Sequence, residues 1–460
     1  MSLPESLVQS LKQIKGFDEA SFRAVHQSGE QVTSIRFNPA KYNGESVSDL
    51  LNTETDGEVP WCSEAYYLKS RPSFTADPLF HAGVYYVQDA SSMILKEALK
   101  QSVELSQPLK LLDLCAAPGG KSTLIQSVIS AESLLVSNEV IKTRVNVLCE
   151  NISKWGAANV IVTQNDPHDF QRLGPYFDVV VVDAPCSGSG LFRKDPSAIE
   201  EWSESHVDLC GQRQQRILAD ILPALKPGGV LIYSTCSYSE TEDEDMVDWL
   251  LDREDIDSIP FDLDAEWNIM GTNSTKHNGY GYRFFPDRLR GEGFFLAAFC
   301  KTGTSEITQS SHHHKKRNDR LNAADQQLLK PYLKMPEEYF FIKQQESVIA
   351  MPIHLEDDLQ AIQANLYIRK AGIKLGSIMH KELIPDHELA QSVMLADDTQ
   401  TLQLDKPDAL QYLRKETISV KTELRGWVLV RYLQFPLGWV KILPNRINNY
   451  YPANWRILNK

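Results

Sequence analysis

One stretch of the sequence, Lys110-Leu-Leu-Asp-Leu-Cys-Ala-Ala-Pro-Gly-Gly-Lys-Ser-Thr123, decides the fold. It begins with a short apolar run at residues 110–114 and continues into a helical pattern at residues 121–130. Small residues in between let the backbone approach a ligand closely, and the helix N-terminus offers free N–H donors. The stretch therefore predicts a strand, a ligand-binding loop and a helix.

A phosphate-binding P-loop is an alternative interpretation of this loop, because Gly120-Lys121-Ser122 fits the end of that motif. The first glycine of the motif would fall at position 115, which is a cysteine. Cys115 therefore excludes the P-loop.

The same alternation of strand and helix patterns continues along the chain and predicts an α/β fold with a parallel sheet flanked by helices. Lys226-Pro-Gly-Gly is interpreted as a helix stop and a turn before the next strand. A last strand at 294–300 is expected to complete the sheet. The expected strands are 110–114, 134–138, 160–164, 178–182, 230–234 and 294–300, and the expected helices are 121–130, 142–154, 205–225 and 240–251.

Length and composition indicate a globular protein of roughly three domains, with 460 residues, 42% hydrophobic and 23% charged. The start of the chain lacks the pattern of a signal peptide, and no apolar run approaches the roughly 20 residues of a membrane span. Seven cysteines, an odd number, argue against a disulfide framework. We expect a cytoplasmic monomer with reduced thiols, no membrane segment and no metal.

The sequence also predicts a domain division. The expected parts are a small N-terminal RNA-binding domain (1–85), the α/β core (86–301), a linker (302–320), a small α+β domain (321–385) and a β-rich C-terminal domain (386–460). His312-His313-His314 is interpreted as part of a solvated linker rather than as a metal site. A chain truncated in this linker is expected to keep a folded core that binds cofactor.

The charge is uneven. The chain carries −14, but residues 401–460 contain ten Lys and Arg against four Asp and Glu, a net +6. Phosphate contacts need local cations rather than a basic total. This distribution is consistent with RNA binding at the C-terminal end.

Acidic residues follow two further strands of the predicted sheet. Glu139 ends the second strand about twenty residues beyond the glycines, where an acid commonly accepts hydrogen bonds from ribose hydroxyls. Asn165 and Asp166 follow the third strand, at a position suited to an adenine edge. Each acid alone is equally well interpreted as a solvated loop residue, but together with the glycine loop they favour a cofactor with an adenosine moiety.

Two cysteines follow the fourth and fifth strands. Cys186 lies in Asp183-Ala-Pro-Cys-Ser-Gly, and Cys236 lies in Ser234-Thr-Cys-Ser. In a doubly wound sheet these strands are neighbours, so both thiols are expected to open into one crevice beside the cofactor. The other cysteines are interpreted as packing residues, as buried thiols usually are: Cys62, Cys115, Cys149, Cys210 and Cys300.

Thiols at this place suggest methylation of a pyrimidine. Carbon 5 is a poor nucleophile until a thiolate adds to carbon 6, after which it is able to attack a sulfonium methyl group. Asp183 is placed to hydrogen-bond the exocyclic amine and the ring nitrogen of cytosine. Methylation of an amino group needs no cysteine.

Several motifs, in this order, resemble one family, the Fmu/Sun-type RNA cytosine-5 methyltransferases. The resemblance covers roughly residues 30–301, and the C-terminal part is similar to the PUA-like tail of the family's bacterial ribosomal branch. The motifs are Gly83-Val-Tyr-Tyr-Val-Gln-Asp-Ala-Ser-Ser, Asp113–Lys121, Asp183-Ala-Pro-Cys-Ser-Gly-Ser-Gly-Leu-Phe-Arg-Lys-Asp-Pro, Ser234-Thr-Cys-Ser-Tyr-Ser and Arg288-Leu-Arg-Gly-Glu-Gly-Phe-Phe.

The resemblance implies a Rossmann-like class I methyltransferase core and S-adenosyl-L-methionine as cofactor. It also implies that Cys236 is the nucleophile, that Cys186 assists release, and that Asp183 and Lys121 lie beside the target base. The small-subunit ribosomal RNA is the implied partner. The implied cofactor contacts are Cys115, Ala116, Ala117, Pro118, Gly119, Gly120, Lys121, Glu139, Arg144, Asp166 and Asp183.

Three other functions remain open from the sequence. A transfer-RNA cytosine methyltransferase would share all of these motifs. A ribosome-assembly factor without activity is disfavoured by the presence of both cysteines. A DNA cytosine methyltransferase would use the Pro-Cys thiol, Cys186, as nucleophile and would lack Thr235-Cys236.

Overall fold

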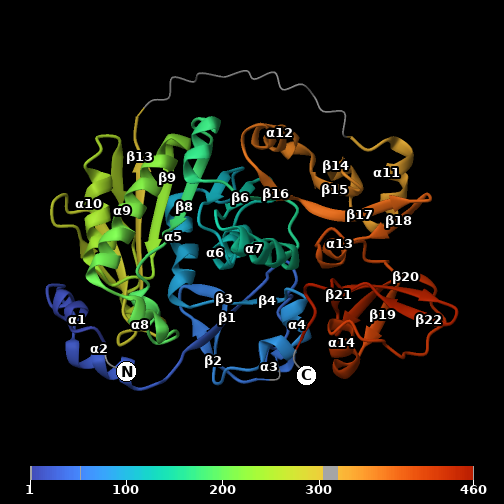
Figure 1. Cartoon of the computed structure of the whole chain (residues 1–460), viewed down its shortest axis with the longest axis horizontal. Helices are drawn as coiled ribbons and strands as arrows, with labels where there is room; N and C mark the ends of the chain where they lie inside the picture. The colour runs from blue at the N-terminus through green and yellow to red at the C-terminus, as the bar shows by residue number, and fades with distance from the viewer. Residues whose placement is uncertain (1–2, 52, 304–319, 459–460) are drawn as a thin grey trace.

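A computed structural model describes residues 3–51, 53–303 and 320–458 of the chain. The predicted linker falls mostly on residues 304–319, which lie outside the described residues together with His312, His313 and His314. Figure 1 shows the large central sheet and its helices on the left of the view, the N-terminal sheet below, and the two C-terminal sheets on the right.

The central sheet has ten strands in the order β11-β12-β13-β9-β8-β5-β6-β7-β16, with β10 paired to β13. Strands β5 to β9 are parallel, and the order reverses at β5, which pairs with both β6 and β8. A ligand crevice is expected at this reversal, outside the carboxyl ends of the strands. The strands are β5 (Lys110–Asp113), β6 (Leu134–Asn138), β7 (Val160–Thr163), β8 (Phe177–Asp183), β9 (Leu225–Thr235), β10 (Ile256–Ile259), β11 (Met270–Asn273), β12 (Tyr280–Phe284), β13 (Phe294–Lys301) and β16 (Ile368–Ala371).

Helices cover both faces of this sheet, which confirms the predicted α/β fold. Side chains alternate between the faces: Leu111 packs in the cluster under α5, α6 and α7, and Leu112 packs in the cluster under α9, α10 and α12. Burial on both faces explains why the strands appear in the sequence as continuous apolar runs. The helices are α5 (Leu95–Ser102), α6 (Gly120–Val128), α7 (Lys142–Trp155), α8 (Ser197–Glu201), α9 (Glu204–Ile221), α10 (Glu244–Leu251) and α12 (Glu356–Asn365).

Three predicted features of the core are wrong. The predicted turn at Lys226-Pro-Gly-Gly lies inside β9, because Gly228 has a φ of 76° and forms an irregularity in the pairing with β8 rather than a turn. The helix predicted from residue 240 begins at Glu244, since Asp243 has a non-helical backbone (φ −117°, ψ −94°). Strand β13 does not complete the sheet, because β12 and β11 extend it further.

The N-terminal part forms a four-stranded antiparallel sheet in the order β2-β3-β1-β4. Its buried Arg36 donates to Thr123 Oγ1 at 2.7 Å and to Gln88 Oε1 at 3.0 Å, and lies over the Trp155 ring. These contacts fix the N-terminal sheet against α6 and α7. The elements are α1 (Glu5–Leu11), α2 (Glu19–Gln27), β1 (Thr33–Phe37), α3 (Val47–Leu51), β2 (Thr55–Val59), β3 (Cys62–Leu68), α4 (Pro78–His81) and β4 (Tyr85–Val87).

The part after residue 320 contains two four-stranded sheets, in the orders β14-β15-β17-β18 and β19-β20-β21-β22. The elements are α11 (Ala323–Leu329), β14 (Tyr339–Gln344), β15 (Ser347–Pro352), β17 (Ile373–Met379), β18 (Glu382–Pro385), α13 (His387–Gln391), β19 (Thr401–Leu404), α14 (Lys406–Leu413), β20 (Gly426–Tyr432), β21 (Phe435–Leu443) and β22 (Arg446–Asn449).

This C-terminal part shares apolar cores with the rest of the chain. Strand β16 pairs with β7 and so belongs to the central sheet. Leu79 and Tyr85 of the N-terminal part lie in one buried cluster with Leu437 and Tyr451. The regions that the sequence predicts as separate modules therefore pack as one body.

Candidate functional site

The loop between β5 and α6 is held in place by hydrogen bonds to the two adjacent strands, β8 and β6. Leu114 N–H donates to Val181 O at 2.9 Å, and Ala116 N–H donates to Asn138 O at 2.8 Å. Gly119 has a φ of 115°, a conformation that glycine adopts without strain, and precedes α6 with no side chain capping the helix. The first N–H groups of α6 are thereby free to face a ligand, as predicted for a cofactor loop.

Glu139 and Arg144 lie beside this loop. Arg144 donates to Ala117 O at 2.6 Å, and its guanidinium lies 3.3 Å from Glu139 Oε2. The Glu139 side chain is 3% exposed; its Oε1 accepts from the N–H of Ile141, and its Oε2 has no hydrogen bond among the described residues. A buried acceptor of this kind is suited to a ribose hydroxyl.

Asp113 is a further acceptor at the end of β5 that the sequence did not single out. It is fully buried, its Oδ2 accepts from Ser122 Oγ at 2.6 Å, and its Oδ1 has no hydrogen bond among the described residues. Burial raises the pKa of this carboxyl to about 7. Its place in front of the glycine loop is the signal that would have identified it.

Of Asn165 and Asp166, the two residues predicted to contact an adenine edge, one already has its side chain hydrogen-bonded to the backbone. The side chain of Asn165 exchanges two hydrogen bonds with the backbone of Tyr367, next to β16, so its expected role in reading a base is not supported. Asp166 accepts from the N–H of His168 and lies 3.3 Å from Arg216, and its side chain is 40% exposed. Asp166 therefore presents a partly exposed carboxylate beyond the carboxyl end of β7.

The two thiols meet. Strands β8 and β9 pair in parallel with Asp183 opposite Ser234, and the Sγ atoms of Cys186 and Cys236 lie 3.0 Å apart. The loops that carry them are also joined by the hydrogen bond from Gly190 N–H to Cys236 O at 2.8 Å. The hydrogen bond with Cys236, together with burial, raises the pKa of Cys186 well above its ordinary value.

An ion pair lies beside the thiols. Lys121 Nζ is 2.7 Å from Asp183 Oδ2 and 5.1 Å from the centre of the Phe294 ring, and Ser234 Oγ donates to Asp183 Oδ1. Burial disfavours the charged ammonium, but the carboxylate of Asp183 outweighs burial and raises the pKa of Lys121. A cation and a hydrogen-bond acceptor are thus fixed where both thiols open.

The remaining cysteines lie elsewhere. Cys62 and Cys210 are buried, and Cys115, Cys149 and Cys300 are half-buried. Burial raises the pKa of Cys115, which packs against the core beneath α9. No second sulfur lies close to any of these five in the described part of the chain.

A basic groove of about 440 Å³ lies on the C-terminal sheet, between the segment before β20 and the turn between β21 and β22. Lys421, Arg425 and Arg446 line it and are exposed, and Thr417, Ser419 and Thr422 add hydroxyl groups. No Asp or Glu of the described residues lines it. Three of the ten Lys and Arg of residues 401–460 therefore lie together in this groove.

Two negative findings concern the same described ranges. No group of three or more His, Cys, Asp and Glu side chains in them has an arrangement that would hold a metal ion. None of their helices combines the length and the apolar composition needed to cross a membrane.

Comparison with known proteins gives three family matches along the chain. The family described as 16S rRNA methyltransferase RsmB/F matches residues 101–300. The N-terminal domain of 16S rRNA methyltransferase RsmF matches residues 3–90, and the methyltransferase RsmF PUA domain matches residues 399–457.

Individual proteins are similar over most of their length. Ribosomal RNA small subunit methyltransferase F of Shewanella loihica is 30% identical over 92% of this chain and 88% of its own. The protein of the same name from Enterobacter sp. is 30% identical over 91% of this chain and 88% of its own.

Solved structures agree on the core. A methyltransferase homolog protein from Pyrococcus horikoshii is 27% identical with a TM-score of 0.51, over 65% of this chain and 100% of its own. NSun6 from the same organism is 20% identical and shares the fold, with a TM-score of 0.55 over 65% of this chain and 99% of its own. With the methyltransferase fold, the paired thiols and these relatives in agreement, the chain belongs to the family of ribosomal RNA small subunit methyltransferase F.

Proposed function

We propose that this chain transfers a methyl group from S-adenosylmethionine to carbon 5 of a cytosine in small-subunit ribosomal RNA. The observation that carries the proposal is the pair of sulfur atoms, Cys186 and Cys236, 3.0 Å apart at the carboxyl ends of adjacent strands. Transfer to an amino group has no use for two thiols, whereas transfer to carbon 5 requires covalent activation of the ring. The names of the relatives supply the class of RNA.

The residues beside the glycine loop fit S-adenosylmethionine. Glu139 Oε2 and Asp113 Oδ1 are buried acceptors without hydrogen bonds among the described residues, and the ligand carries ribose hydroxyls and an ammonium group as donors. When bound, this ligand supplies an electrophilic methyl group on a sulfonium sulfur. We assign its contacts to the loop Cys115–Lys121 and to Glu139, Arg144, Asp166 and Asp183.

Cys236 is the attacking residue in this proposal. Its thiolate forms a bond to carbon 6 of the cytosine, and the double bond between carbons 5 and 6 opens, so that carbon 5 becomes nucleophilic. Asp183 accepts a hydrogen bond from the exocyclic amine, while the ammonium group of Lys121, 2.7 Å from Asp183 Oδ2, holds that side chain in place. The interactions grow stronger as charge develops on the ring.

Cys186 is then the base that completes the reaction. Its raised pKa means that Cys186 holds its proton before the attack, because the hydrogen bond and the negative charge of Cys236 favour the protonated form of Cys186. Once the sulfur of Cys236 is bonded to carbon 6, both effects end, and Cys186 loses its proton to solvent more readily. The Cys186 thiolate removes the proton from carbon 5, the bond between carbon 6 and sulfur breaks, and the Cys236 thiolate is restored.

The basic groove supports RNA as the partner. Lys421, Arg425 and Arg446 present three exposed cations with no lining carboxylate among the described residues, which suits the phosphates of an RNA strand. Because the whole chain carries −14, RNA that approaches elsewhere meets a mostly negative surface. We propose that this groove holds RNA at a distance from the reacting base.

Mapping of 5-methylcytosine in RNA from cells with and without the gene tests the proposal. We expect at least one cytosine of small-subunit ribosomal RNA to lose its methyl group in the cells without the gene, and an active copy to restore it. Loss confined to transfer RNA would establish the transfer-RNA alternative. No loss in any RNA would establish an assembly factor without activity.

A further inference from the structure

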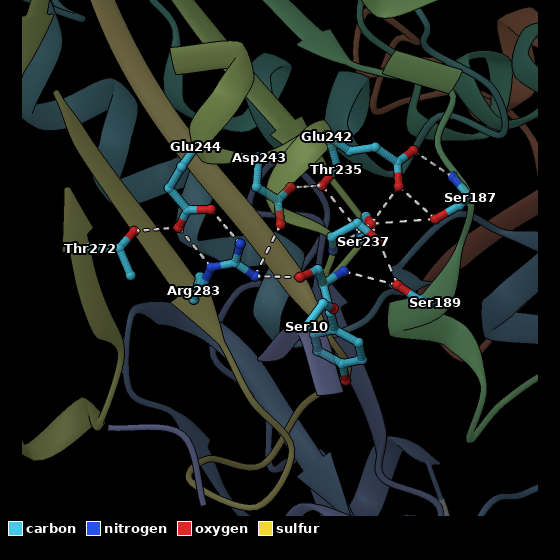
Figure 2. A network of polar contacts seen from close by, with 12 residues as sticks. Ser10, Ser187, Ser189, Thr235, Ser237, Glu242, Asp243, Glu244, Thr272 and Arg283 are labelled. Carbon is cyan, nitrogen blue, oxygen red and sulfur yellow. Dashed lines mark hydrogen bonds and ion pairs between the residues drawn. The ribbon is translucent and has the colours of Figure 1, made fainter. Parts of the chain in front are cut away.

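A buried carboxylate lies directly behind the two thiols and contacts both of the loops that carry them. Glu242 follows β9 in a short 3₁₀ turn, Glu240–Glu242, and its side chain is completely buried. Figure 2 shows it between Ser187 on one side and Ser237 on the other. Each of these serines is the residue immediately after a cysteine, Cys186 or Cys236.

Glu242 accepts hydrogen bonds from both loops. On the Cys186 side it accepts from the N–H of Ser187 at 2.7 Å and from the Ser187 hydroxyl at 2.5 Å. On the Cys236 side it accepts from the Ser237 hydroxyl at 2.6 Å. A buried acceptor that loses its donors, or donors that lose it, cost free energy, so these contacts resist separation of the loops. One carboxylate therefore connects the two segments whose separation fixes the distance between the thiols.

The carboxylate is itself held in place by the core. Gln214 of α9 donates to Glu242 Oε1 at 3.2 Å and to Pro185 O at 3.1 Å. Tyr233 of β9 donates to Gln214 Oε1 at 3.0 Å and to Glu242 O at 2.7 Å. Because these partners belong to a helix and to a central strand, Glu242 has little freedom to follow a loop that moves.

A second set of contacts holds the residues beyond Glu242. Asp243 accepts from Thr235 Oγ1 at 2.6 Å and lies 3.1 Å from Arg283, and Arg283 donates to Glu244 and to Tyr238 O (Figure 2). This buried group holds Thr235 and Tyr238, on either side of Cys236. It makes no hydrogen bond with the described residues of the loop that carries Cys186. Within this acidic turn it is the carboxylate of Glu242 that contacts both loops, in addition to the direct hydrogen bond from Gly190 N–H to Cys236 O.

We propose that Glu242 is a positioning residue that holds Cys186 and Cys236 at the separation their successive steps require. The inference rests on the proposed function and adds a residue to it. Without the carboxylate, the two serine hydroxyls, the Ser187 N–H and the Gln214 amide lose a buried acceptor, and the loops must shift to find other partners. A displacement of about 1 Å at a reacting group is enough to slow a reaction roughly 10²-fold.

The positioning role of the Glu242 side chain can be tested separately from its charge. In Glu242→Gln, the remaining oxygen still accepts from Ser187 N–H and Gln214, and the new amide donates to the serine hydroxyls, which rotate to accept. We therefore expect Glu242→Gln to react close to normally and Glu242→Ala to react slowly. Ser237→Ala removes the Glu242 contact on the Cys236 side, together with the hydrogen bond from Ser239 N–H to Ser237 Oγ, and should slow attack as well. Glu240→Ala is the matched control, because Glu240 lies in the same turn and is exposed.

The experiment measures covalent capture of substrate RNA at saturating RNA and cofactor, in full-length chains that also carry Cys186→Ala so that the adduct cannot be released. We expect adduct formation to be roughly 10²-fold slower with Glu242→Ala. It should stay within a few-fold of the parent with Glu242→Gln and unchanged with Glu240→Ala. Cofactor affinity should be the same in all variants, because Glu242 contacts no residue of the cofactor loop.

Each other result has a distinct meaning. Adduct formation at the parent rate in folded Glu242→Ala overturns the positioning role. A Glu242→Gln variant as slow as Glu242→Ala also overturns it, since charge and not geometry would then matter. If Glu242→Ala does not fold, Ser237→Ala decides, and a parent-like rate in that variant overturns the inference. A Cys186→Ala parent that forms no adduct overturns the proposed function itself.

Discussion

The sulfur atom of Cys186 lies 3.0 Å from that of Cys236, and this contact is the largest cause of the raised pKa of Cys186. A hydrogen bond with a neighbouring sulfur, and negative charge on that sulfur, both favour the protonated form of Cys186. In the proposed function Cys236 is the sulfur that attacks, and Cys186 is the one that becomes a base afterwards.

Removal of Cys236 should lower the pKa of Cys186. In Cys236→Ala the side-chain hydrogen bond and the charge of Cys236 that raise the pKa of Cys186 are gone, while burial and the charge of Glu242 remain. The thiolate fraction of Cys186 at a given alkaline pH should then rise, and its alkylation should become faster. Alkylation by iodoacetamide across about pH 7 to 10, with peptide mapping to separate the cysteines, measures this. An unchanged pH profile would mean that the two sulfurs do not interact.

Glu139 should contribute more to cofactor binding than Asp166. Glu139 offers a buried oxygen with no hydrogen bond among the described residues, whereas Asp166 is partly exposed and already caps the following turn. We expect Glu139→Ala to weaken S-adenosylmethionine binding by roughly 1–3 kcal/mol and Asp166→Ala by less. Titration calorimetry on folded variants gives both values. Normal affinity in both variants would show that neither carboxylate contacts the cofactor.

The basic groove should govern the salt dependence of RNA binding. Arg446→Gln is expected to weaken RNA binding and to reduce the slope of log K against log salt by about 0.7, the value for one phosphate contact on a single strand. Arg456→Gln is the control, since Arg456 is exposed in the same region but does not line the groove. Filter-binding titrations at several salt concentrations measure both slopes. Equal slopes for the two variants would place the RNA elsewhere.

Local patterns were sufficient for the centre of the fold. Strands buried on both faces leave continuous apolar runs, and the residues that follow them gather at one edge of a parallel sheet. Asp183 and Cys236 could therefore be assigned to one crevice from the sequence, and their strands are adjacent in the structure.

Contacts between distant segments could not be predicted in this way. The pairing of β16 with β7 joins residues about two hundred positions apart, and nothing in Ile368–Ala371 shows which edge it will extend. Glu242 was missed for a related reason, because its sequence surroundings, Glu240-Thr-Glu-Asp-Glu, resemble an exposed acidic helix start. Only the fold shows that one of these acids is buried between two loops.

The shared cores change the expected result of truncation. The sequence suggested that a chain ending in the 302–320 linker would keep a folded core. In the structure such a chain loses β16 from the central sheet and α12 from one face of that sheet. It also exposes the apolar residues of the N-terminal part that Leu437 and Tyr451 cover. We expect it to unfold at a clearly lower temperature or to aggregate, as judged by thermal unfolding and size-exclusion chromatography. A monomeric fragment with the melting temperature of the full chain would contradict this packing.

The central claim is that Cys236 attacks and Cys186 releases, and the covalent adduct between protein and RNA tests it most directly. Labelled substrate RNA, S-adenosylmethionine and each of three variants are resolved on one denaturing gel. Cys186→Ala should accumulate an adduct, because attack and methyl transfer proceed while the final elimination stalls. Cys236→Ala and the double variant should form none, because the attacking sulfur is absent. An adduct in Cys236→Ala, with none in Cys186→Ala, would show that the nucleophile is Cys186 and would contradict the account.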